Sequence, residues 1–380
     1  MLNMGLPEPI DVQTEDHARE VLAQVMELTH VGLDTETTGL NLLRDYPVYW
    51  SLSDGANRWG IEERFLELFQ PFFDAEPITK ILTNAKFDKH MLANIGIDLR
   101  GPLWDTVVMG WLINVNGQHD LKSDMTRNYR LLPPDAMASF RKVFLTDETT
   151  GKARNMPKGV NVGDLFLEAL DEQREKAVEY ATKDAWASYV LAWTMKERLE
   201  RIPFGDDGWT GWDHYSTVEV PFTPVLWRSE RRGITVDLGH LEEIAVELLD
   251  TMDTTLRKFT QSAGRVVNVN SPMQLRDIFY LYDEENNEWL DPWDRPCRYW
   301  TKGGKAGNRM PSTDKRALET WAEEGVQEAQ LIMDYRAVSK LHDTYIKKMG
   351  PRLDGQMRVH TSLNQSGTQT GRLSSSGPNL

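Results

Sequence analysis

The stretch HVGLDTETTGL, residues 30–40, decides the fold of the first half of the chain. Its apolar residues 31–33 predict a buried strand, and the following Thr-Gly pair predicts a turn. Asp34 and Glu36 lie two residues apart near the end of this strand, so their side chains point to the same face. Both carboxylates can therefore reach one cation, although an isolated D-x-E pattern also arises by chance on an exposed strand edge.

The sequence on either side predicts an α/β fold. Residues 46–55, 57–61 and 78–85 have the apolar, β-branched composition of strands, and a helix follows at residues 86–96. Asp105 is placed to cap another helix. Strands that come first and helices that come later indicate one mixed sheet with helices packed on it. We expect an irregular insertion at residues 131–163 and then a long helix at residues 172–201.

Three further polar residues follow strands or share a helix face. Asp88 lies in the first turn of the helix at residues 86–96, where an acid could also serve only the helix dipole. Asn84 ends the preceding strand and could bind a DNA end or simply form a turn. Tyr180 and Asp184 are four residues apart on the long helix, hence neighbours on one face. Taken alone, that pair could equally be a half-buried tyrosine beside a surface acid.

The order of these acids along the chain indicates a shared site. They occur in the order D-x-E, D and Y-x-x-x-D, each on an element that can meet the others at one end of a sheet. Carboxylates packed together repel one another, and some stay protonated unless cations compensate their charge. Oxygen ligands without Cys or His favour hard ions, so the pattern predicts Mg²⁺ or Mn²⁺.

DTETTGL, NAKFDKHML and YATKD resemble the three motifs of the proofreading exonuclease domain of family A (DNA polymerase I-like) polymerases, in the DEDD class with a tyrosine. The resemblance implies a ribonuclease H-like fold and a two-metal mechanism. Asp34 would bridge both metals, Glu36 and Asp184 would complete one site, and Asp88 would hold the second. Tyr180 would orient the attacking water, and Leu40 would wedge against the terminal base.

The implied reaction is 3′→5′ removal of nucleotides from DNA as nucleoside monophosphates. A two-metal site stabilises both the attacking and the leaving oxygen of an in-line displacement at phosphorus. Frayed or single-stranded 3′ ends should be preferred, because a mismatch has already lost the free energy of pairing.

The second half resembles the same family. LWRSERRGITVD is similar to the entry of the polymerase region, and TGRLSS is the most specific part of a similarity to the first palm segment. The stretches similar to successive parts of the thumb are NVNSPMQLRDIFY, STDKRALETWA and YRAVSKLHDTYI. Ser271 is expected to cap a helix, with Gln274 completing a capping box. We therefore expect an exonuclease domain at residues 1–202, a mainly helical thumb at 213–348 and a partial palm at 349–380.

Several residues of the second half are candidate contacts with a primer–template duplex. Residues 298–316 form a basic island that could be a solvated loop; the resemblance places it at the thumb tip, where Lys302, Lys305 and Arg309 could meet phosphates. By the same resemblance Arg372 would contact the primer terminus, and Asn379 would touch the template side.

The segments that carry the polymerase aspartates in the resembling family would come after Leu380. We therefore expect no DNA synthesis from these 380 residues alone. Three explanations are compatible with this expectation. The rest of palm and fingers could lie on a second polypeptide, the gene product could be incomplete, or the end at residue 380 could be artificial. The domain order resembles a phage-type enzyme. The competing hypothesis is a non-catalytic DNA-binding or assembly subunit of a split polymerase.

Composition sets the remaining expectations. The net charge of −15 argues against a uniformly basic coat but not against local DNA contacts. A single cysteine excludes an internal disulfide and a Cys-rich zinc site. The N-terminus lacks an apolar signal core, and no apolar run could span a bilayer. We expect a cytoplasmic protein, in a bacterial host if it is phage-encoded, that does not bind membranes.

Overall fold

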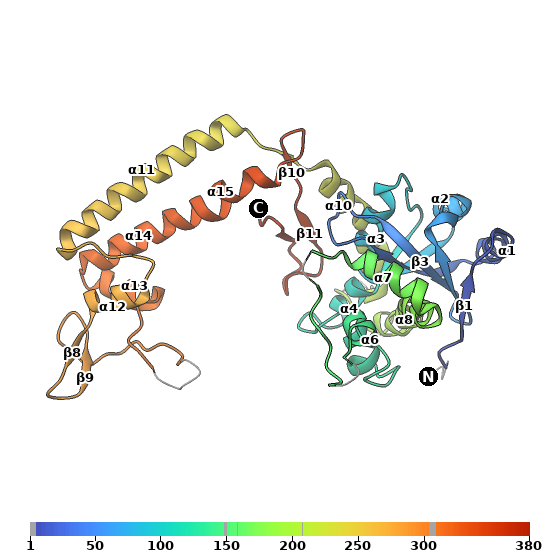
Figure 1. The fold of residues 1–380 in the computed structure, drawn as a ribbon, viewed down its shortest axis with the longest axis horizontal. Helices are drawn as coiled ribbons and strands as arrows, with labels where there is room; N and C mark the ends of the chain where they lie inside the picture. Colours follow the sequence, from blue (N-terminus) through green and yellow to red (C-terminus); the bar gives the residue numbers. More distant parts are fainter. Residues whose placement is uncertain (1–4, 148–149, 158, 207, 304–308) are drawn as a thin grey trace. The chain divides into compact units, whose positions relative to one another are not determined.

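The computed structural model describes residues 5–147, 150–157, 159–206, 208–303 and 309–380. Its internal contacts divide the chain into two compact units (Figure 1). Unit 1 comprises Met1–Arg232 and Thr361–Leu380, and unit 2 comprises Gly233–His360. Each unit is described by itself.

A mixed sheet, six-stranded in the described part of unit 1, has the strand order β1-β4-β3-β2-β5-β6. The central β2 pairs antiparallel with β3 and parallel with β5, while β1 is parallel to β4 and β6 to β5. The sequence thus correctly predicted a mixed sheet, although it missed the short edge strands β1 and β6. The strands are β1 (Pro9–Val12), β2 (His30–Thr37), β3 (Pro47–Ser53), β4 (Arg58–Glu62), β5 (Thr79–Leu82) and β6 (Leu103–Asp105).

Helices cover both faces of this sheet (Figure 1). Ile81 and Leu82 are successive residues of β5 and enter different apolar cores, because side chains alternate across a strand. One core includes α1 and α2, and the other includes α4 and α8. The helices of unit 1 are α1 (Glu15–Met26), α2 (Gln70–Asp74), α3 (Ala85–Asn94), α4 (Thr106–Ile113), α5 (Leu121–Ser123), α6 (Phe140–Phe144), α7 (Val162–Glu172), α8 (Arg174–Leu199), α9 (Gly211–His214) and α10 (Val220–Arg232).

The approach of α8 to β2 depends on Gly32. A Cβ atom at this position would collide with the carbonyl oxygen of Ala185 and lie 3.1 Å from Cβ of Tyr189. Glycine is therefore needed here for close approach of two backbones, not for its freedom in φ. The contact sets α8 against the same strand that carries Asp34 and Glu36.

The expected domain boundaries differ from those of the compact units. The expected exonuclease domain ends at residue 202 and the expected thumb begins at 213, yet α9 and α10 belong to unit 1. Trp212 packs edge-on against Trp104 at 4.7 Å, and the backbone N–H of Asp105 donates to the Tyr215 hydroxyl at 2.6 Å. Residues 349–380 are also divided, because only those from Thr361 onward join unit 1. The functional division at 202, 213 and 349 stays a prediction, since compact units reflect contacts alone.

Unit 2 is mainly helical, as the sequence predicted. Its long α11 packs along α14, and Phe279 stacks on Trp321 at 4.9 Å in the core. Its α-helices and β-strands are β7 (Ile234–Thr235), α11 (Leu238–Ala263), α12 (Pro272–Phe279), β8 (Leu281–Asp283), β9 (Glu288–Leu290), α13 (Lys315–Glu323), α14 (Gln327–Leu341), α15 (Lys347–Met349) and β10 (Arg358–Val359). In unit 1 the C-terminal segment adds β11 (Ser362–Asn364), paired with β12 (Ser374–Ser376).

Helix ends agree with the sequence in most particulars. Asp105 caps α4 through Val107 N at 2.9 Å, and Ser271 caps α12 through Gln274 N at 3.4 Å. The expected capping box at α12 is only half formed, because the Gln274 side chain accepts from the backbone of Asn268 instead. No described helix combines the length and apolarity that crossing a bilayer requires.

Gly32→Ala should destabilise unit 1 by about 1–3 kcal/mol, because the added methyl group forces α8 away from β2. The same substitution at Gly5, where an added Cβ meets open space, is the control. Urea unfolding monitored by tryptophan fluorescence measures the difference. Equal midpoints for the two variants would show that the close contact at Gly32 carries no energetic weight.

Candidate active site

The structure brings the acidic residues predicted from the sequence to one end of the central sheet. Asp34 and Glu36 lie on β2 and are half-buried, and Asp184 on α8 is half-buried as well. Asp88, in the first turn of α3, is buried. All four interact electrostatically, since the charges of Asp184, Asp88 and Glu36 each act on Asp34.

Local backbone features hold these acids in place. The pairing of β2 with β3 shifts register between Glu36 and Thr37, so the strand is irregular directly after the second acid. Between the two acids, the Thr35 hydroxyl donates to Oδ1 of Asp88 at 2.7 Å and links β2 to α3. Sequence reasoning missed Thr35, whose only signal was its position inside the motif.

The start of α3 is fixed by Asp105. Its carboxylate accepts from the backbone N–H groups of Asn84 at 3.0 Å and of Ala85 at 2.8 Å. Asn84 has φ +65°, the left-handed conformation that asparagine tolerates better than most residues. Asn84 therefore forms the predicted turn. Its side chain is exposed, so the alternative role in binding a DNA end stays a prediction.

The electrostatics of the site oppose ionisation of all four acids. Burial, followed by the charges of Asp184 and Asp88, raises the pKa of Glu36 to about 8. Burial also raises the pKa of Asp34 well above its usual value. It raises that of Asp88 to about 7 despite the hydrogen bond from Thr35, and that of Asp184 to about 6 despite the nearby Lys183 ammonium. Neighbouring positive charge is thus too weak to offset burial and repulsion.

Tyr180 lies one helical turn before Asp184, as predicted. Burial, with the charges of Glu36 and Asp184, raises the pKa of its hydroxyl far above the usual value, so the phenol stays protonated at neutral pH. Phe140 and Phe144 pack edge-on against its ring at 5.9 and 5.7 Å. Both come from α6, inside the region expected to be irregular. Their four-residue spacing was the signal for this short helix.

A cavity of about 250 Å³ opens beside Tyr180 and Asp184. Three basic side chains, Lys122, Lys176 and Lys183, are among the residues that line it. Lys183 donates to the carbonyl of Ala136 at 3.2 Å and pairs with Glu179 at 3.1 Å. Sequence reasoning missed these lysines, because only the fold places them next to the acids.

The donor set suits a hard divalent cation, but its arrangement is not a preformed cage. Carboxylates without cysteine or histidine are the ligands that Mg²⁺ and Mn²⁺ prefer. Within the described ranges, however, no three acidic, His or Cys side chains are placed to ligate one ion together. The four carboxylates therefore suit a divalent cation because they offer oxygen ligands and because their negative charge is not compensated by the protein. Ligation by three of them needs side-chain rotation.

Leu40 follows this strand on an exposed loop. Its side chain is 82% exposed. The loop base is tied by the Asp45 carboxylate, which accepts from the Thr38 hydroxyl at 3.0 Å and from Asn41 N at 2.6 Å. The Leu40 side chain is thus exposed on a loop that is fixed by hydrogen bonds. This is compatible with the predicted role of Leu40 as a wedge against a terminal base.

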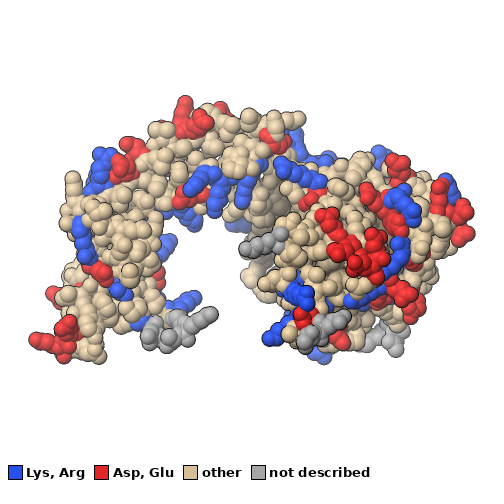
Figure 2. Space-filling view, viewed as in Figure 1, with Lys and Arg blue, Asp and Glu red and all other residues tan. Residues whose placement is uncertain are grey.

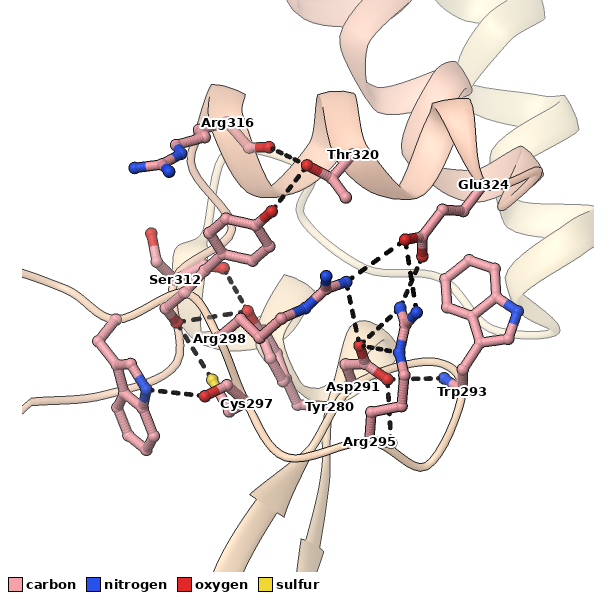
Figure 3. A network of polar contacts seen from close by, with 12 residues as sticks. Tyr280, Asp291, Trp293, Arg295, Cys297, Arg298, Ser312, Arg316, Thr320 and Glu324 are labelled. Carbon is pink, nitrogen blue, oxygen red and sulfur yellow. Dashed lines mark hydrogen bonds and ion pairs between the residues drawn. The ribbon is translucent and has the colours of Figure 1, made fainter.

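The first residue of the basic island in unit 2, Arg298, belongs to an ion-pair network (Figure 3). Asp291, 4% exposed, accepts from Arg295 Nε at 2.9 Å, and Arg295 also donates to Glu324 at 2.6 Å. Lys302 and Arg309 are exposed on either side of residues 304–308. Lys305 lies outside the described residues.

Figure 2 shows further Lys and Arg side chains along α14 and α15 of unit 2, which sequence reasoning did not single out. Lys340, Lys347 and Lys348 are exposed there. In unit 1, Arg372 and Asn379 are exposed as well, on the segment that contains β11 and β12. The Thr368 hydroxyl donates to the carbonyl of Arg372 at 2.7 Å and closes its turn.

Comparison with known proteins agrees with this architecture. Residues 9–200 match the family described as 3'-5' exonuclease, and residues 239–380 match DNA polymerase family A. A DNA polymerase I from Synechocystis is 31% identical over 79% of this chain and 26% of its own length. One from Pseudomonas aeruginosa is 28% identical over 94% of this chain and 37% of its own length.

A solved structure has the same fold. The POL domain of Pol1 from M. smegmatis, in complex with DNA primer-template and dNTP, superimposes with a TM-score of 0.66 at 22% identity, over 98% of this chain and 55% of that one. This chain thus spans less than two fifths of the length of the two curated relatives. Both relatives are bacterial and give no support to the expectation of a phage-type enzyme.

Asp34→Asn should stabilise the metal-free protein at pH 8, by on the order of 1 kcal/mol, because it removes a carboxyl group whose ionisation is opposed by burial and by the neighbouring acids. The folded-state pKa values of these acids are raised. The stability they contribute is therefore present below pH about 4 and is lost as pH rises towards about 8.

The gain from Asp34→Asn should accordingly shrink as pH falls from 8 to 4, measured as thermal midpoints in EDTA. Glu168→Gln, an exposed acid on α7, is the matched control. A stabilisation that is independent of pH, or equal in the control, would contradict the proposed repulsion.

Proposed function

The chain belongs to DNA polymerase family A, with that family's 3′–5′ exonuclease domain followed by the start of its polymerase domain, and we propose that unit 1 is a metal-dependent proofreading exonuclease. The observation that carries this proposal is the gathering of Asp34, Glu36, Asp88 and Asp184 at one end of the sheet, where burial raises the pKa of each of them. Uncompensated acids of this kind are destabilising, and such sites are often functional.

The proposed site binds two divalent cations, Mg²⁺ or Mn²⁺. Bound there, the ions would supply the nucleophile and stabilise the leaving 3′ oxygen. Asp34 would contact both ions, Glu36 and Asp184 would complete one site, and Asp88 would serve the other. Thr35 would keep one Asp88 oxygen in place through its 2.7 Å hydrogen bond.

Tyr180 would act through its hydroxyl. Because its pKa is raised, the phenol keeps its proton and can donate a hydrogen bond that orients the attacking water. The edge-on contacts with Phe140 and Phe144 restrict its ring, so the position of its hydroxyl oxygen is restricted before substrate binds.

The proposed substrate is a single-stranded or frayed 3′ end of DNA. Leu40 would press against the terminal base, and the lysines of the adjacent cavity would meet phosphates of the strand. Hydrolysis would then release a nucleoside monophosphate and leave a shorter 3′ end.

For DNA synthesis, we propose that this chain contributes the thumb-like unit 2 and the segment with Arg372 and Asn379 to binding a primer–template duplex. Palm and fingers segments beyond these 380 residues, on the same or a second polypeptide, would supply nucleotidyl transfer. The exposed lysine and arginine side chains of unit 2 support contacts with DNA phosphates.

Asp34→Ala should abolish release of mononucleotides from labelled single-stranded DNA in Mg²⁺ or Mn²⁺, with a loss of at least about 100-fold. The exposed-acid variant Glu168→Gln should retain the rate of the unaltered chain. If the unaltered chain binds DNA yet releases no mononucleotide with either metal, it is instead a non-catalytic DNA-binding or assembly subunit.

Lys302→Ala should weaken duplex binding and reduce the slope of log affinity against log salt by about 1, because one phosphate contact is lost. Lys315→Ala is the control, since Lys315 pairs with Glu319 at 3.3 Å on α13. Fluorescence anisotropy at several salt concentrations gives both slopes. Identical slopes for the two variants would remove Lys302 from the interface.

A further inference from the structure

Glu230 of α10 joins three segments of unit 1 at a buried point. It is 3% exposed and forms an ion pair with Lys86, and its second oxygen is 2.8 Å from Nε2 of His90. Lys86 and His90 flank Asp88 on α3, two residues away on either side. Glu230 also accepts from the backbone N–H of Leu363 at 2.7 Å. One carboxylate thus connects α10, α3 and the C-terminal segment.

Arg231, the next residue of α10, contacts the other end of α3. Its Nη1 donates to Oδ1 of Asn94 at 2.8 Å. The amide nitrogen of Asn94 in turn donates to the carbonyls of Asp45 at 2.7 Å and Leu42 at 3.2 Å. Those carbonyls belong to the loop that displays Leu40.

The chemistry of arginine fixes the direction of this chain of hydrogen bonds. A guanidinium only donates, so it must face the amide oxygen of Asn94. The amide nitrogen is then directed at the loop carbonyls. Without Arg231 the amide could rotate, and the loop would lose its defined attachment to α3.

We propose that Glu230 and Arg231 are positioning residues of the exonuclease, a role that rests on the function proposed above. Glu230 holds the first turns of α3 in place, and this keeps Asp88 next to the acids of β2. Arg231 holds the Leu40 loop through Asn94. Neither residue touches the acids themselves, so both act through α3.

The same contacts tie the exonuclease site to the segment that matches the polymerase family. Lys86 also donates to the carbonyl of Leu363, so both backbone polar groups of that residue are bonded within this network. Farther along, the indole N–H of Trp111 donates to Thr368 O at 2.9 Å. This segment contains Arg372. DNA bound at Arg372 would therefore act on the hydrogen bonds and ion pairs that position α3.

Arg231→Met tests the loop attachment, with Arg228→Met as the matched control. Arg228 is an exposed arginine on the same helix, so its loss removes the same charge without touching Asn94. In the 380-residue chain, Arg231→Met should raise KM for single-stranded DNA about tenfold with little change in kcat. Amide hydrogens of residues 38–46 should exchange about tenfold faster. The control should change neither quantity.

A double-mutant cycle shows whether Arg231 acts through Asn94. Asn94→Ala should reproduce the loop effects of Arg231→Met, and combining the two should add nothing further. Additive effects, or unchanged exchange in Arg231→Met, would overturn the proposal. If the unaltered chain shows no nuclease activity, the proposed function fails, while hydrogen exchange still decides the role of Arg231.

Glu230→Gln tests the other half. It keeps the size of the side chain but leaves the Lys86 ammonium without its counter-charge. The Mg²⁺ concentration for half-maximal activity should rise about tenfold, with KM for DNA unchanged, because the register of Asp88 is affected and the loop is not. A purely structural role would lower the fraction of folded protein and leave the midpoint of metal activation unchanged, which would refute the proposal.

Discussion

The crowding of four carboxylates at one end of the unit 1 sheet is the constraint around which the rest of this unit is arranged. It depends on the close approach of α8 to β2, which only a residue without a side chain permits at position 32. Burial raises the pKa values of all four acids, and the charges of neighbouring acids of the cluster raise those of Asp34 and Glu36 further. The cluster therefore lowers the stability of the metal-free fold, as is common at functional sites.

Several contacts outside the motifs restrain this unfavourable cluster. The buried Asp105 carboxylate serves α3 and α4 at once, because it accepts from Asn84, Ala85 and Val107. From α10, Glu230 contacts Lys86 and His90 of α3, and Arg231 contacts Asn94, the last residue of that helix. The helix that brings Asp88 to the acids is thereby held at both ends by polar groups that are themselves buried or paired.

The sequence was most informative where a local rule determines the structure. Strand alternation placed Asp34 and Glu36 together, helical spacing did the same for Tyr180 and Asp184, and capping preferences identified Asp105 and Ser271. It failed where contacts between distant residues decide. The lysines near Tyr180, the bond from Thr35 to Asp88 and the inclusion of α10 in unit 1 all depend on tertiary packing. Gln274 likewise bonds Asn268 because the preceding loop folds back, which no helix-end pattern specifies.

The most direct test of the central claim is anomalous X-ray scattering from crystals of the Tyr180→Phe variant, which keeps all four acids and should slow turnover. The crystals are grown with Mn²⁺ and a single-stranded oligonucleotide. Two manganese peaks are predicted among Asp34, Glu36, Asp88 and Asp184. Manganese absent from this end of the sheet, or bound only elsewhere on the protein, would contradict the account.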